Sequence, residues 1–278
     1  MHPILLDASR YGIVVPASGG MLMLALLLAF WLVPRSAEAI AGIDRRTARI
    51  IFLTVALATL VGGRLHFVLN APTVFVGRWH AAFIPWFGGY HVGGGFLAGV
   101  IAMIWSARRF GVPFLRLADG MLPPAGICVA VGRLGCFLQG CCIGAPCDHA
   151  WCLPYPKGSA AYLLQSDLGM IPPDAPHSLA LHPLQLYFAG AALLVSAAMY
   201  AVARRRRYDG ETALVGFFLF WASTAALEGL RAPWAATPPW GPLRQLHWVA
   251  LSLAAAFFLA LVCAEVAHRV RRPAAAAS

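Results

Sequence analysis

The sequence predicts an all-α integral membrane protein with about seven transmembrane helices. Of its 278 residues, 60% are hydrophobic and only 12% are charged, and the mean hydropathy is +0.72. A soluble domain carries about a quarter charged residues, twice this share. The apolar residues also gather in runs that approach the ~20 residues an α-helix needs to cross a bilayer.

Seven apolar runs predict the transmembrane helices in chain order. They cover about 13–34, 50–69, 92–107, 120–139, 184–203, 213–231 and 246–264. The third is short for a straight span, and the first is long enough to span without a clear cleavage site for a signal peptide. No repeat or soluble domain interrupts the series, so residues 1–278 are predicted to form a single polytopic membrane domain.

The basic residues predict the orientation of these helices. The net charge of +10 would favour nucleic acid as a partner in a soluble protein, but here the basic residues border apolar runs. Alternate loops hold fourteen basic residues on one side and four on the other. By the positive-inside rule, the N-terminus lies outside and the C-terminus in the cytoplasm.

Two segments fall outside the predicted helices. The connection at about 140–182 lies on the outer face, is rich in Pro, Cys and His, and is long enough to favour a functional role. The alanine-rich tail at about 273–278 is predicted to be disordered.

Four ionisable residues lie inside the apolar runs: Arg64, Arg133, Glu228 and Arg231. A charge at bilayer depth costs at least ~2.5–3.5 kcal/mol, so it usually faces a partner, a cavity or a ligand. Glu228 and Arg231 are three residues apart and therefore share a helical face. Either this pair simply locks helices together, or the excess of arginine forms a cavity for an anion, of which a lipid phosphate is the most available.

The segment "GGYHVGGGFLAG" at 88–99 holds six glycines in twelve residues. Glycine lets a backbone approach another helix or a ligand closely. We expect Gly93–Gly95 to form an irregular segment that lines a cavity, whereas Gly99 fits either helix packing or ligand contact.

Several motifs then occur in the order and rough spacing of a known family. They are "YG" at 11–12, "GGRLHFVL" at 62–69, "GGFLAG" at 94–99, "GRLGCFLQGCCIG" at 132–144, "HPLQLY" at 182–187 and "EGLRAP" at 228–233. Over nearly its whole length the chain resembles the prolipoprotein diacylglyceryl transferases, seven-span enzymes of the bacterial plasma (inner) membrane.

The resemblance implies a transferase reaction. The family moves a diacylglyceryl group from phosphatidylglycerol to the lipobox cysteine thiol of a preprolipoprotein, so that a thioether forms and glycerol phosphate leaves. The implied partners are phosphatidylglycerol or another anionic phospholipid, the lipobox segment and the membrane, with no nucleic acid. The resemblance implies no cofactor and no metal. Buried arginines fit this chemistry because they can bind the head group and stabilise the departing charge.

The resemblance also implies the site residues. Arg133 matches the family's essential arginine. The implied catalytic residues are Arg133, Tyr11, His91, Cys141 and Glu228. The implied substrate-binding residues are Arg64, Gly94, Gly95, Gly135, Gln139, Gly144, His182, Gln185, Tyr187 and Arg231.

This chain departs from the family pattern at several of these positions. Cys136 and Gln139 stand where the family has two asparagines, and Cys141 stands where it has a glutamate. The family's His-Gly-Gly is Gly93–Gly95 here, with His91 two residues earlier as the nearest histidine. Thr224 replaces an arginine four residues before the acid on the sixth span.

Seven cysteines bear on the function. Cys128 and Cys263 lie within apolar runs and are expected to be core residues. The cysteines at 141, 142, 147 and 152 lie at or beyond the outer end of the fourth span, where a disulfide, free thiols and a zinc site with His149 are the alternatives. A disulfide between Cys147 and Cys152 would close a small loop.

Three functional hypotheses follow. The first is the diacylglyceryl transferase. The second is a divergent paralogue in which Cys141, beside Arg133, handles thiol or other lipid chemistry through a covalent intermediate. The third is a non-catalytic membrane protein that keeps the lipid-binding cavity for transport or scaffolding.

Overall fold

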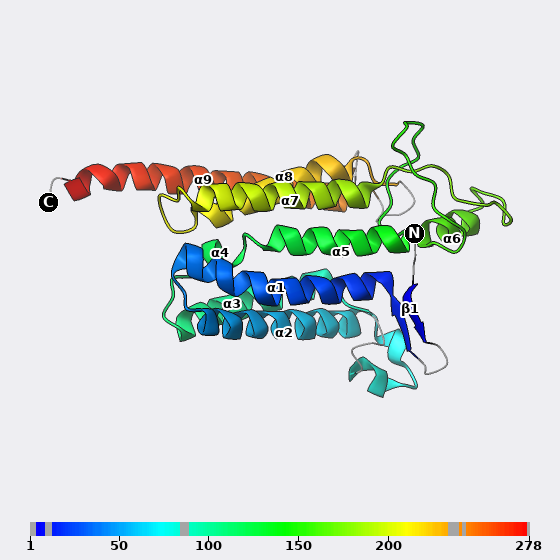
Figure 1. Cartoon of the computed structure of the whole chain (residues 1–278), viewed down its shortest axis with the longest axis horizontal. Helices are drawn as coiled ribbons and strands as arrows, with labels where there is room; N and C mark the ends of the chain where they lie inside the picture. The colour runs from blue at the N-terminus through cyan, green and yellow to red at the C-terminus, as the bar shows by residue number, and fades with distance from the viewer. Residues whose placement is uncertain (1–3, 9–12, 84–88, 233–238, 241–242, 277–278) are drawn as a thin grey trace. The chain divides into compact units, whose positions relative to one another are not determined.

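A computed structural model describes residues 4–8, 13–83, 89–232, 239–240 and 243–276. Its described residues are mainly helical (Figure 1). The chain divides into two compact units, which are treated separately below. The first unit comprises Met1–Ala29 and Leu122–Ser278, and the second comprises Phe30–Met121.

The first unit contains the C-terminal helices and the long connection at about 140–182. Its elements are β1 (Ile4–Ala8), β2 (Ile13–Pro16), the start of α1 (Ala17–Ala41), α5 (Ala125–Gln139), α6 (Ala160–Asp167), α7 (Leu184–Ala203), α8 (Glu211–Glu228), β3 (Pro239–Trp240), β4 (Leu243–Arg244) and α9 (Gln245–Ala276). β1 pairs with β2, and β3 with β4, as short antiparallel hairpins. Helix α5 packs on α7, α7 on α8 and α8 on α9, so these four helices form a continuous series (Figure 1).

The second unit is built around one helix pair. It holds the remainder of α1, α2 (Arg45–Asn70), the 3-10 helices η2 (Pro72–Phe75) and η3 (Trp79–Phe83), α3 (Val92–Arg109) and α4 (Phe114–Met121). Helix α2 begins at Asp44, whose carboxylate accepts hydrogen bonds from the backbone N–H groups of Arg46 and Thr47, both at 2.9 Å. The chief packing contact of the unit joins α2 to α3.

The helices confirm an α-helical membrane protein. Among the described residues, α1, α2, α7 and the Leu246–Val270 part of α9 are long and apolar enough to cross a membrane. Helices α3 and α4 meet at a bend of 118° and make a fifth candidate if they form one broken span. Helix makes up most of each of the seven predicted ranges, but the count of seven spans and the orientation of the termini remain predictions.

Two local predictions are wrong. The fourth predicted span began at residue 120, whereas α5 begins at Ala125, because Pro123 and Pro124 interrupt the helix. Gly93–Gly95 form the regular first turns of α3 instead of an irregular segment, since His91 caps the helix and α2 packs against it. Helix α9 extends to Ala276, residues 277–278 lie outside the described range, and the disordered tail stays a prediction.

Close approach of α2 and α3 depends on Gly62. A Cβ atom added there would lie 2.3 Å from Ala98 Cβ and 2.6 Å from the Gly94 carbonyl oxygen. We therefore expect Gly62→Val to destabilise the protein by about 1–3 kcal/mol through overpacking. Thermal unfolding in detergent measures the loss. Gly190→Ala on α7 is the control, because open space surrounds that position. Equal stability of the two variants would contradict the prediction.

Candidate functional site

A backbone ladder brings three distant segments together in the first unit. Residues 143–145 lie between the strand-like segments at 181–182 and 230–232. Gly144 N–H donates to the His182 carbonyl at 3.2 Å, and Ala145 N–H donates to the Leu230 carbonyl at 2.7 Å. A Cβ atom on Gly144 would lie 2.5 Å from His182 Cβ, so this meeting of the segments requires glycine. The ladder places the end of the "GRLGCFLQGCCIG" motif beside the last turn of α8.

Arg133 lies on α5, at the second position of that motif. Its side chain is half-buried, and its guanidinium carbon lies 4.6 Å from the centre of the Phe188 ring on α7. Within the described part of the chain, this guanidinium has neither a hydrogen bond nor an ion pair. A contact with an aromatic ring uses no N–H donor, so the planar fork keeps its donors for a phosphate or carboxylate.

Glu228 and Arg231 form the ion pair that their spacing predicts. Arg231 Nε lies 2.6 Å from Glu228 Oε1, and the Glu228 side chain is only 1% exposed. The other carboxylate oxygen, Oε2, is buried and accepts no hydrogen bond from any described residue. The site therefore contains a buried carboxylate oxygen that is available to a proton or a donor group.

Three thiols cluster at the end of α5. The sulfur atoms of Cys136, Cys141 and Cys142 all lie within 4.8 Å of one another, and all three cysteines are free thiols. Cys136 belongs to the last turn of α5, and the chain then turns through Gly140, so that Cys141 N–H donates to the Cys136 carbonyl at 3.1 Å. Cys142 has φ of 57°, a left-handed conformation that is uncommon for a residue with a side chain.

The pKa values of the cysteines in this cluster shift in opposite directions. The pKa of Cys142 falls well below its ordinary value because the Cys136 and Cys141 thiols donate hydrogen bonds to its sulfur. The positive charges of Arg133 and Arg231 lower it further. The pKa of Cys141 rises, because its thiol donates to the neighbouring sulfurs and is partly buried. The pKa is therefore lowered at Cys142 and raised at Cys141, the residue that the motif comparison singles out.

Buried side chains hold the cluster in place. Gln185, which is fully buried, donates from Nε2 to the Cys141 carbonyl at 2.5 Å. Its Oε1 accepts the Tyr155 hydroxyl at 3.1 Å, and Tyr155 is also fully buried. The glutamine expected to bind substrate thus positions the backbone of Cys141.

The contribution of the buried Tyr155 hydroxyl to the stability of the fold depends on pH. Burial raises the pKa of its hydroxyl to about 12, while an unfolded tyrosine ionises near 10. The folded state therefore favours the protonated hydroxyl, and this contribution is complete below about pH 10 and is lost as the pH rises through 12. We expect Tyr155→Phe to lower the melting temperature at pH 8 and to narrow its difference from the wild type between pH 10 and 12. A difference that stays constant over this range would contradict the assignment.

His182 belongs to the ladder, and its ring lies close to a disulfide. The disulfide joins Cys147 to Cys152, which is one of the three alternatives that the sequence left open. The sulfur atoms of this disulfide and a ring nitrogen of His182 lie within 4.8 Å of one another. His182 Nδ1 lies 3.3 Å from the Tyr187 hydroxyl, so the two side chains of the "HPLQLY" motif contact each other.

Arg64 has a different environment, in the second unit. Its guanidinium donates to the carbonyl oxygens of Ala82, Gly89 and Ala81 at 2.9, 2.9 and 2.7 Å, respectively. It therefore holds the segment after α2 in place. It also borders an apolar hollow of about 450 Å³ whose walls include Leu57, Val61 and Tyr90. This hollow suits an acyl chain more than a head group.

The other second-unit candidates lie at the start of α3. His91 Nδ1 accepts a hydrogen bond from Gly93 N–H at 3.3 Å and caps the helix. Its ring centre lies 4.1 Å from that of His66, whose Nδ1 is buried and has no hydrogen-bond partner among the described residues. Gly94 and Gly95 pack against α2, which accounts for both residues without a ligand.

For three further predicted site residues, the structure shows no contact that suggests a role in binding or catalysis among the described residues. Gly135 packs against α1, where a Cβ atom would lie 2.8 Å from Met21 Cβ. Gln139 is the last residue of α5 and is half-buried. Tyr11 lies outside the described residues.

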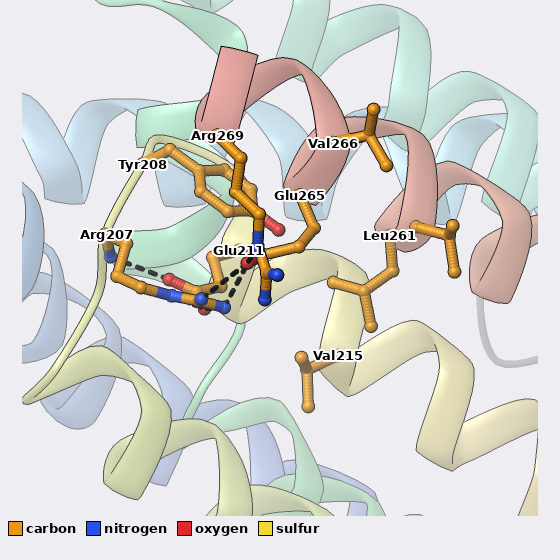
Figure 2. A pocket seen from close by; sticks show the side chains of 9 residues that line it. Arg207, Tyr208, Glu211, Val215, Leu261, Glu265, Val266 and Arg269 are labelled. Carbon is orange, nitrogen blue, oxygen red and sulfur yellow. Dashed lines mark hydrogen bonds and ion pairs between the residues drawn. The ribbon is translucent and has the colours of Figure 1, made fainter. Parts of the chain in front are cut away.

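A further hollow of about 520 Å³ lies between α8 and α9 (Figure 2). Arg207 pairs with Glu211 at 2.6 Å and with Glu265 at 2.8 Å, and Glu265 also pairs with Arg269 at 2.7 Å. Each charged side chain here therefore has a partner of opposite charge. Glu211 begins α8 and Glu228 ends it, so the hollow is about 25 Å from the candidate site at 1.5 Å per residue. Its network holds α9 to α8.

Sequence reasoning missed two contributors to the site. Phe188 lies against Arg133, and Tyr155 supports Gln185 from a position thirty residues earlier in the chain. Phe188 directly follows the "HPLQLY" motif, which is a signal that could have found it. Nothing in the sequence near Tyr155 marks it.

Comparisons with known proteins identify the family to which this sequence is similar. The family described as prolipoprotein diacylglyceryl transferase matches residues 8–263. The chain is similar to proteins named phosphatidylglycerol–prolipoprotein diacylglyceryl transferase in several bacteria. The match to the Paracidovorax citrulli protein is 35% identical over 62% of this chain and 59% of that protein. The Bradyrhizobium diazoefficiens protein is 36% identical over 50% of this chain and 44% of that protein. The Proteus mirabilis protein is 31% identical over 61% of this chain and 60% of that protein. The matches thus span about half the length of these relatives.

Proposed function

The chain belongs to the prolipoprotein diacylglyceryl transferase family, and from this membership we propose that it is a diacylglyceryl transferase. Its donor would be phosphatidylglycerol or another anionic phospholipid, and its acceptor the lipobox cysteine of a preprolipoprotein. The reaction would take place at the outer face of a bacterial plasma (inner) membrane. The names of the relatives specify phosphatidylglycerol and prolipoprotein as their substrates.

One observation carries the proposal. Arg133 is the half-buried guanidinium that no described residue pairs, and it occupies the position of the family's essential arginine. The other two arginines inside the apolar runs are engaged: Arg64 binds carbonyl groups, and Arg231 binds Glu228. An unpaired guanidinium at this depth is costly unless it meets an anion. Phosphate is the anion that the donor lipid supplies.

The side chains can be given roles in the reaction. Arg133 binds the phosphodiester and stabilises the charge that grows on the leaving glycerol phosphate. Glu228 Oε2, buried and unpaired, accepts the proton of the acceptor thiol. The acceptor sulfur attacks the diacylglyceryl carbon, the C–O bond to phosphate breaks, and glycerol phosphate leaves with the electron pair.

A second candidate function rests on the thiol cluster. Three thiols within 4.8 Å of one another, next to two arginines, favour thiol chemistry by the chain itself. This is the divergent-paralogue hypothesis, with Cys142 replacing Cys141 as the reactive group. It predicts a diacylglyceryl adduct on the protein, whereas the transferase leaves the adduct on the acceptor.

The test uses the purified full chain in phosphatidylglycerol micelles with a lipobox peptide. We expect glycerol phosphate release in step with a diacylglyceryl mass gain on the peptide. A peptide with serine in place of cysteine is the control and is expected to gain no mass. Adduct on the protein alone would favour the second candidate. Absence of release and of any adduct with folded protein would overturn both.

A further inference from the structure

The three-thiol cluster has the geometry of a metal site. Thiolates bound tetrahedrally to Zn²⁺ at about 2.3 Å lie about 3.8 Å from one another. The sulfur atoms of Cys136, Cys141 and Cys142 already lie within 4.8 Å of one another. Side-chain rotation by part of a rotamer step closes the remaining distance, which is about 1 Å at most.

The backbone around the cluster is held in place before any ligand arrives. Cys142 keeps a left-handed backbone at φ 57°, and this conformation persists only where the surroundings enforce it. Gln185 holds the Cys141 carbonyl and is itself held by Tyr155. Buried hydrogen bonds that orient the ligands are typical of metal sites.

The surrounding charges also suit a thiolate site. Three thiolates and one divalent ion leave one net negative charge, and a bound acceptor thiolate adds another. Arg133 and Arg231 both act on Cys142 electrostatically and offset these charges. Three protein ligands leave a fourth tetrahedral position open, as in catalytic zinc sites.

We propose that Cys136, Cys141 and Cys142 bind one Zn²⁺-type ion whose open position receives the acceptor thiol. The identity of the acceptor rests on the proposed function. Zn²⁺ suits the task because it has no redox chemistry and so does not oxidise the thiol that it binds. It would also explain why Cys136 and Cys141 stand where the family motif has polar groups.

The chemical step balances without an oxidant or reductant. The acceptor thiol would give its proton to Glu228 Oε2 as its sulfur binds the ion, because a coordinated thiol is held deprotonated. That sulfur then forms the bond to the diacylglyceryl carbon, while the C–O bond to phosphate breaks and glycerol phosphate takes the electron pair. The thioether product is a neutral, weaker ligand and leaves the ion.

Metal binding tests the site without any turnover. The full chain, purified in detergent with its thiols reduced, is loaded with Zn²⁺ or Co²⁺ and freed of excess ion. We expect about one ion per chain and thiolate-to-cobalt charge-transfer absorption. Serine at Cys136, Cys141 or Cys142 is expected to weaken retention about tenfold or more. Wild-type protein that is folded and reduced but retains no ion would overturn the proposal.

Two sets of control variants locate the ion. Cys128→Ser and Cys263→Ser remove free thiols elsewhere and are expected to keep the ion. The double variant Cys147→Ser/Cys152→Ser removes the only other metal-like grouping among the described residues, which includes His182. It is also expected to keep the ion. Loss of the ion in the double variant, with retention in Cys142→Ser, would overturn the assignment to the three-thiol cluster.

The open position is tested with the peptide. We expect the cysteine peptide, but not its serine version, to shift the absorption of the cobalt-loaded protein. An unchanged spectrum at saturating peptide would overturn the acceptor role. Transfer by metal-free wild type at the full rate would overturn the inference and leave the proposed function intact. The converse, a peptide-dependent cobalt shift without transfer, would support the site and count against the proposed function.

Discussion

Replacing Arg133 by alanine is expected to reduce diacylglyceryl transfer about 10²–10³-fold, the usual cost of removing a group that stabilises charge in a transition state. The guanidinium has no ion pair or hydrogen bond to a described residue, so its loss removes no internal polar interaction. Its contact with Phe188 contributes about 0.5–1 kcal/mol, and the variant should therefore remain folded. Initial rates of glycerol phosphate release, together with thermal unfolding, measure both effects.

Two further variants separate charge from geometry. Arg133→Lys keeps the charge but loses the planar fork, so its rate should lie between those of the wild type and Arg133→Ala. Arg45→Ala removes an exposed arginine that pairs with Glu38 at the surface, and it should leave the rate unchanged. Wild-type activity in Arg133→Ala would show that the phosphate is bound elsewhere and would remove the observation on which the proposed function depends.

Local features of the site could be predicted from the sequence. The Glu228–Arg231 pair follows from a spacing of three on a helix, and helical geometry fixes that contact wherever the helix lies. The disulfide of Cys147 and Cys152 follows from a short loop, since only a few backbone angles separate the two sulfur atoms. The positions of the helices follow from long apolar runs, although Pro123 and Pro124 delay the start of α5.

Contacts between distant segments could not be predicted. Arg64 and Arg133 both interrupt apolar runs in glycine-rich motifs. Of the two, only Arg64 donates hydrogen bonds to backbone carbonyl groups, and these lie 17 to 25 residues later in the chain. The same holds for Tyr155, which reaches Gln185 across 30 residues. Tertiary packing decides such partners, and no local pattern records them.

The backbone conformation of Cys142 also could not be predicted from the family motif. A match to the family motif places Cys141 at the acid position, so sequence comparison directs attention there. Cys142 has a left-handed backbone, its sulfur lies within 4.8 Å of the other two, and it accepts hydrogen bonds from both thiols. A motif records residue types and spacing but not this turn, so it does not show that Cys142 is the thiol with the lowered pKa.

The second large effect is expected at the buried ion pair. Arg231→Ala should destabilise the protein by about 3–5 kcal/mol, because it leaves the Glu228 carboxylate without its partner while that side chain is only 1% exposed. Glu228→Gln should cost less, because the Arg231 side chain is 12% exposed and can turn toward solvent. Chemical unfolding of the detergent-solubilised variants measures the two losses.

The double variant Glu228→Gln/Arg231→Gln shows whether the loss arises from an uncompensated charge. With both charges absent, no ion is left buried, and the double variant should be more stable than Arg231→Ala alone. The backbone ladder between Arg231 and Gly144 is unaffected by these side chains, so it cannot account for the difference. Losses that simply add would mean that the two side chains stabilise the fold independently. The buried Oε2 of Glu228 would then be an ordinary polar atom of the core, and the proton-accepting role proposed for it would have no support.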